Sequence, residues 1–132
     1  MPESMFDVRL VKRGPLFDGR TAAALHAYSD EISLRIAEEG EKLIRQRLHT
    51  VLQHPTGYYE SRISVDRAGQ GYRVSDGNVI YGPWLEGTGS RNSPVTRFPG
   101  YATFRRTKPL VDKRAREIAV RLLARYKAMG LI

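Results

Sequence analysis

The chain of 132 residues has room for one domain with one hydrophobic core, and a second domain is not expected. Its hydrophobic fraction of 41% and charged fraction of 27% are ordinary for a globular chain. No stretch approaches the roughly 18 consecutive apolar residues of a membrane span, and the first residues lack the apolar run of a secretory signal. Cysteine is absent, which excludes disulfides and thiolate metal sites and fits a reducing cytoplasm.

The charge is the most informative part of the composition. Twenty-two Lys and Arg against fourteen Asp and Glu give a net charge of +8 and a pI near 10.1. Such a balance fits a polyanionic partner, nucleic acid first, and it also fits docking on acidic protein surfaces. The basic residues are spread along the sequence, with no Lys/Arg tract of the kind that marks a disordered nucleic-acid tail.

The N-terminal part predicts a strand and then a long helix. Residues 5–11 alternate loosely and indicate a short strand, so that 1–19 form an N-terminal strand or arm. From about 21 to 53 the apolar residues recur at helical spacing, although Gly40 interrupts the pattern and suggests a bend or break. Such a helix is roughly 45 to 50 Å long, which hints that neighbouring subunits cover part of it. The apolar stripe consists of Leu25, Tyr28, Ile32, Ile36, Leu43 or Ile44, Leu48, and Val51 or Leu52.

The middle of the chain predicts a small antiparallel sheet with one face on the long helix. Period-two alternation and turn signals at 69–71 and 76–77 place strands at 58–67, 71–75 and 78–86. Residues 87–107 then have three Gly, two Pro and no periodicity, which is typical of a functional loop or one ordered by a partner. Pro109 is expected to open a second amphipathic helix, with Thr107 or Lys108 near its cap. The predicted class is therefore α+β, with residues 1–132 as a single domain.

The sequence offers little for catalysis. The three histidines, His26, His49 and His54, lack metal-ligand spacing, and no nucleophile motif is present. The glycine-rich stretch GTGSRN does not end as a phosphate-binding loop does. We therefore expect no metal, no cofactor and no enzymatic activity. Four carboxylates on or beside the predicted sheet are interpreted as solvated strand charges: Glu60, Asp66, Asp76 and Glu86.

Aromatic residues with arginines between them follow the predicted strands. They resemble a stacking platform for single-stranded nucleic acid, but packing of the sheet against the long helix is the favoured interpretation. Trp84, after Gly82 and Pro83, is expected to be half exposed, as at a protein–protein contact. The aromatic set consists of Tyr58, Tyr59, Tyr72, Tyr81 and Trp84.

The order of these elements resembles a known family, the tail-component or tail-completion proteins of long-tailed bacteriophages, which include lambda minor tail protein Z. The resemblance covers roughly residues 20–128. The chain departs from the family pattern at Gly82, where alanine is usual, and in a longer 89–107 loop, where Phe104 takes the place of the usual Pro-Phe-aliphatic lead into the last helix. The matching motif consists of Tyr81, Gly82, Trp84, Glu86, Gly87 and Thr88, followed by Arg97, Phe98 and Pro99.

The resemblance implies a non-enzymatic structural protein of the virion, assembled in the host cytoplasm and located at the head–tail junction, without a membrane. It implies a homo-oligomeric ring, six-fold favoured and twelve-fold possible, between neighbouring neck and tail-terminator proteins, with DNA passing through its channel without sequence-specific binding. Glu86 would pair with an arginine of a neighbour's loop, Arg91 or Arg97. The candidate subunit-interface residues are Trp84, Glu86, Gly87, Thr88, Arg91, Arg97, Phe98 and Phe104.

The residues expected to face DNA lie around the start of the second predicted helix. They are Arg105, Arg106, Lys108, Lys113 and Arg114. The alternative to the ring protein is a small basic nucleic-acid-binding protein that uses this helix and the sheet aromatics. Strongly salt-dependent DNA binding would favour the alternative.

Overall fold

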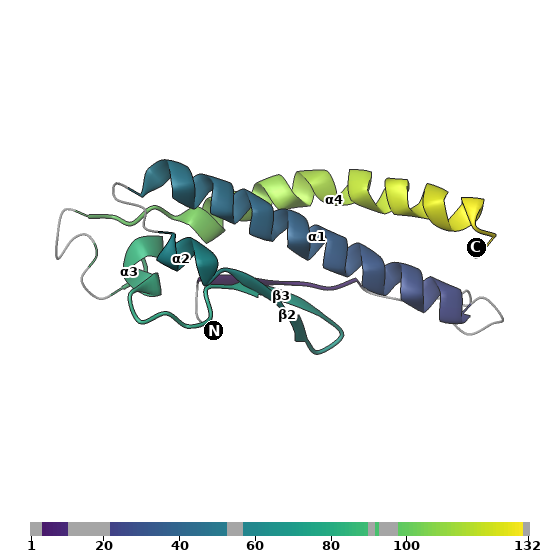
Figure 1. The fold of residues 1–132 in the computed structure, drawn as a ribbon, viewed down its shortest axis with the longest axis horizontal. Helices are drawn as coiled ribbons and strands as arrows, with labels where there is room; N and C mark the ends of the chain where they lie inside the picture. The colour runs from purple at the N-terminus through teal and green to yellow at the C-terminus, as the bar shows by residue number, and fades with distance from the viewer. Residues whose placement is uncertain (1–3, 11–21, 53–56, 90–91, 93–97, 131–132) are drawn as a thin grey trace.

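The predicted α+β class is confirmed by a computed structural model, which describes residues 4–10, 22–52, 57–89, 92 and 98–130. The α1 helix lies in the middle, with α4 along one side of it and the sheet along the other (Figure 1). The elements, in chain order, are β1 (Met5–Val8), α1 (Ala22–Val51), α2 (Tyr58–Ser61), β2 (Ser64–Ala68), β3 (Gly71–Ser75), α3 (Gly82–Glu86) and α4 (Thr103–Ala128).

The α1 helix follows the predicted apolar stripe and runs unbroken through Gly40. The suggested break is therefore wrong. Gly40 is buried where β1 and α4 converge on α1: a Cβ atom here would lie 2.7 Å from Phe6 Cζ and 3.5 Å from Val111 Cγ2. The glycine provides room for a neighbouring ring, which explains its place in the interior of a helix despite its low propensity.

The sheet has three antiparallel strands in the order β1-β3-β2, with Val74 of β3 opposite both Phe6 and Val65. The predicted strand 71–75 is confirmed, and so is an N-terminal strand. The predicted strand 58–67 is wrong over its first half, where α2 forms. Tyr59 and Ile63 are both buried, and a spacing of four residues suits one helical turn as well as a strand.

The predicted strand 78–86 is wrong. After β3, Asp76 accepts the backbone N–H of Asn78 at 3.0 Å, and Gly77 and Asn78 have φ values of 70° and 61°. These left-handed conformations turn the chain away from the sheet. Ile80 consequently projects into solvent with 97% of its surface exposed, and α3 follows. Of the five aromatics assigned to strands, only Tyr72 lies on one.

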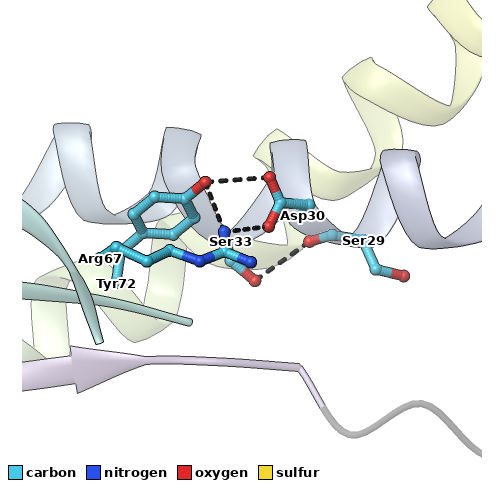
Figure 2. Close-up of polar contacts among 5 residues, drawn as sticks. All are labelled: Ser29, Asp30, Ser33, Arg67 and Tyr72. Atoms are coloured by element: carbon cyan, nitrogen blue, oxygen red, sulfur yellow. Dashed lines mark hydrogen bonds and ion pairs between the residues drawn. The ribbon is translucent and has the colours of Figure 1, made fainter. Parts of the chain in front are cut away.

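Tyr72 joins the β2–β3 hairpin to α1 (Figure 2). Its hydroxyl donates to Asp30 Oδ2 at 2.9 Å and accepts from Arg67 Nη1 at 2.8 Å, and Arg67 also donates to Asp30 Oδ1. The Arg67 guanidinium lies 4.9 Å from the centre of the Tyr72 ring. This ring is therefore covered by its own chain, which agrees with packing of the sheet against the helix.

The α4 helix begins at Thr103, six residues before Pro109, so the predicted start is wrong and the loop is correspondingly shorter than 87–107. Pro109 lies inside the helix and is exposed. The α4 and α1 helices run antiparallel (Figure 1), and the hydroxyl of Tyr28 donates to the carbonyl of Ala119 at 2.8 Å. Val111, Leu122 and Tyr126 of α4 are buried, whereas Met129 just past its end is exposed.

We expect Gly40→Val to lower the free energy of unfolding by about 1–3 kcal/mol, because the new side chain would collide with the Phe6 ring. Urea titration followed by circular dichroism measures the change. Ala27→Val is the matched control, since Ala27 is exposed on the same helix and the substitution should cost within about 0.5 kcal/mol. Equal costs for the two variants would contradict the packing role of Gly40.

Candidate functional site

Two segments that carry most of the resemblance lie against each other. We call residues 82–89 and 98–105 the joint. The N–H of Tyr101 donates to the carbonyl of Leu85 at 2.7 Å, and the N–H of Ala102 donates to the carbonyl of Glu86 at 3.1 Å. Gly87 and Gly100 have φ values of 104° and 88°, and a Cβ atom on Gly100 would lie 2.2 Å from the Cα of Gly87. The two backbones are therefore in direct contact, and only glycine fits at both positions.

Glu86 is the centre of the joint. The residue is 3% exposed, and its Oε1 and Oε2 atoms accept the backbone N–H groups of Phe104 at 2.9 Å and Arg105 at 3.1 Å. These N–H groups belong to the first turn of α4, where no backbone acceptor is available and the helix dipole favours negative charge. Burial raises the pKa of Glu86, while the two N–H donors and the charges of Arg105 and Arg47 oppose part of this rise.

Glu86 thus has a different role from the expected one. Both of its carboxylate oxygens have partners within its own chain, so the carboxylate holds α4 to α3. Arg91 and Arg97, the expected partners from a neighbour's loop, lie outside the described residues.

Asp76 is likewise buried, with 1% of its surface exposed, so the interpretation of these two carboxylates as solvated strand charges is wrong. Asp76 Oδ2 accepts a hydrogen bond from the hydroxyl of Tyr59 at 2.8 Å. Burial and, second to it, this hydrogen bond raise the pKa of Tyr59. A Cβ atom on Gly82 would lie 2.0 Å from Asp76 Oδ2. A residue with a Cβ atom therefore does not fit at position 82 unless the carboxylate of Asp76 moves.

Trp84 is half-buried and begins a row of aromatic rings. Its ring centre lies 4.7 Å from that of Phe98, which lies 5.1 Å from that of Tyr101. The rings border an open hollow of about 560 Å³. The hollow is lined by Trp84, Leu85, Phe98, Pro99, Gly100 and Tyr101.

Two residues that sequence reasoning missed support the joint. Asn92 is buried, donates to the carbonyls of Trp84 at 3.0 Å and Phe98 at 3.2 Å, and accepts the N–H of Gly89 at 2.8 Å. Arg47 of α1 donates from Nη2 to the carbonyl of Tyr101 at 2.9 Å. No periodicity marks Asn92, and Arg47 resembles any charged residue of an amphipathic helix, so neither could be recognised from the pattern.

The structure divides the candidate interface residues. It brings Trp84, Glu86, Gly87 and Phe98 together in the joint, and Thr88 beside them is exposed. Phe104 is 3% exposed and packs edge-on against Phe6, at 6.4 Å between ring centres, so it belongs to the core of its own chain.

The candidates for facing DNA are also divided. Arg105, Arg106, Lys108 and Lys113 are exposed on α4. Arg114 instead forms an ion pair with Glu39 of α1, at the contact between the two long helices.

The joint holds chain segments in place, and the side chains of Glu86 and Asn92 are engaged by backbone groups within it. In the described part of the chain, His, Asp and Glu side chains form no group of three that could hold a metal ion, and no helix is both long and apolar enough to cross a membrane. No family model, curated protein or solved structure matches the chain.

We expect Glu86→Gln to lower the free energy of unfolding at neutral pH by about 1–3 kcal/mol, because an amide has one acceptor oxygen for two buried N–H donors. Urea unfolding measures the loss. Glu117→Gln, at an exposed position of α4, is the control and should change stability by less than about 0.5 kcal/mol. An equally small effect at position 86 would contradict the capping role.

The raised pKa of Glu86 predicts a pH dependence. The folded chain binds this proton more tightly than the unfolded chain, in which the pKa is about 4.3. The stability that Glu86 contributes is therefore largest below the unfolded pKa and declines as the pH rises through the folded pKa. We expect the difference in unfolding free energy between wild type and Glu86→Gln to shrink as the pH rises above the unfolded pKa. A difference that grows with pH would show a lowered pKa instead.

Proposed function

We propose that the chain is a structural subunit of the head–tail junction of a long-tailed bacteriophage, where copies form a ring around the DNA channel. The observation that carries this proposal is the joint: the motif around Glu86 and the stretch from Phe98 to Arg105, which are separated in sequence, interlock as one unit. The joint supports a role in which these residues hold the fold together.

An exposed apolar surface next to the joint supports a contact with another protein. Ile80 is 97% exposed, Tyr58 58% and Tyr81 40%; we call these three residues the end patch. The segments that carry them are neighbours, since the ring centres of Tyr59 and Tyr81 are 5.7 Å apart. A fully exposed isoleucine beside two exposed tyrosines is typical of a surface that another chain covers.

In the proposed ring, the joint holds the end patch and the Trp84 row in a fixed orientation toward neighbouring subunits. The role needs no chemical step. Six-fold symmetry is favoured and twelve-fold is the alternative, with neck and tail-terminator proteins above and below the ring, and the protein resides in the virion.

Electron microscopy of a lysate from a phage that lacks this gene tests the proposal. We expect DNA-filled heads and separate tails, and we expect the purified protein to join them into infectious particles. Intact virions in the absence of the gene would overturn the proposal and favour the small nucleic-acid-binding protein, whose exposed cations are described below.

Ile80→Asp tests the end patch in the same assay. A charge at this exposed position should leave the circular dichroism spectrum unchanged but lower the yield of joined particles at least about tenfold. A tenfold loss corresponds to about 1.4 kcal/mol, and removing a carboxylate from water into an apolar contact costs more than that. Gln70→Asp is the control. It adds the same charge at the exposed tip of the β2–β3 hairpin, at the end of these two strands that is remote from the end patch, and it should give the wild-type yield of joined particles. Full joining by Ile80→Asp would remove the end patch from the contact.

A further inference from the structure

Nearly all of the chain's net charge lies on one helix. The α4 helix contains nine Lys and Arg against two acidic residues, a net charge of +7 out of the chain's +8. The remaining 106 residues carry thirteen basic and twelve acidic side chains and are almost neutral. The even spread of basic residues along the sequence therefore conceals a strong segregation of charge in space.

The cations of α4 fall into two groups. On the flank toward α1 and along the helix itself they form ion pairs: Arg114 with Glu39, Arg121 with Glu117 and Arg125 with Glu31. On the solvent side they are exposed, and none of them forms a salt bridge with any residue that the structure describes. We call the members of this second group that share one face of the helix the basic stripe: Arg105, Arg106, Lys113, Arg116 and Lys127. Lys108 is also exposed without a salt bridge, but it lies off this face.

The basic stripe is straight and long. Arg105, Arg116 and Lys127 are spaced by 11 residues, which is close to three full turns of helix, so they lie in a row. At about 1.5 Å per residue, the row extends over roughly 33 Å. This length is close to one helical turn of duplex DNA, about 34–36 Å, over which the phosphates of a strand return to the same face.

We propose that the basic stripe contacts the phosphate backbone of duplex DNA without reading its sequence. Unpaired, solvent-exposed cations gain from phosphates through release of the counterions on DNA, whereas cations already paired with carboxylates gain less. An acidic protein partner is disfavoured because only two large exposed apolar residues, Leu110 and Val120, lie beside the stripe, where a protein interface needs buried anchors. The helix has no Asn or Gln for pairing with adenine.

The inference rests on the proposed ring for its biological setting, in which the stripe would face DNA in the channel. It also revises the predicted set of residues. Arg116 and Lys127 join Arg105, Arg106 and Lys113, whereas Lys108 lies off the face of the stripe and Arg114 belongs to the helix–helix contact. The DNA-binding test needs only the purified protein. It can therefore fail while the joining assay succeeds, and the joining assay can fail while the DNA-binding test succeeds.

Fluorescence anisotropy with a labelled 30-base-pair duplex of mixed sequence, titrated at several salt concentrations, tests the inference. Five phosphate contacts predict that log K falls against log salt with a slope of about −4 to −5. The double variant Lys113→Gln and Arg116→Gln should lower the magnitude of the slope by about 2 and weaken binding at every sequence tested. The matched control is Lys42→Gln with Arg62→Gln, which removes the same charge from exposed positions outside α4.

The inference is supported if the stripe variant loses slope and affinity while the control retains both. Equal losses in the two double variants would overturn it, since net charge alone would then explain binding. Binding to labelled polyglutamate as tight as to the duplex at the same salt would also overturn it, in favour of an acidic protein partner. Circular dichroism spectra that match wild type confirm that each variant is folded.

Discussion

The capping of α4 by Glu86 is the interaction on which the rest of the structure depends. Pro109 lacks a backbone N–H and costs a helix interior about 3 kcal/mol, so a helix is expected to start at this residue and not before it. Two hydrogen bonds from the first turn to Glu86, together with the burial of Phe104 and Thr107, offset this cost. The helix therefore begins six residues earlier, at Thr103.

The early start of α4 also determines where its charges lie. The added turns bring Arg105 and Arg106 onto the helix, in line with Lys113, Arg116 and the residues beyond. At the same time the antiparallel contact with α1 directs Arg114 and Arg125 toward carboxylates of the partner helix. One capping contact thus separates the cations that stabilise the helix pair from those that remain available to a polyanion.

The long helices and their buried faces could be predicted because apolar spacing repeats over many turns, as from Ile32 to Leu48. Short elements could not. Tyr59 and Ile63 fit both a strand and one helical turn, and the sequence pattern does not show that the hydroxyl of Tyr59 reaches Asp76. The joint was only half predictable. Its glycines indicate a sharp turn, but nothing in the sequence around Glu86 shows that its partners are two backbone N–H groups 18 and 19 residues further on.

The close approach of Gly82 to Asp76 has an evolutionary consequence. The space that a methyl group would need at position 82 is occupied by the carboxylate of Asp76, which the hydroxyl of Tyr59 holds in place. The two positions are therefore coupled: a lineage that acquires alanine at 82 must first lose the aspartate at 76 or move it, and with it the acceptor for the tyrosine. An alanine at position 82 is therefore expected together with a change at Asp76 or Tyr59.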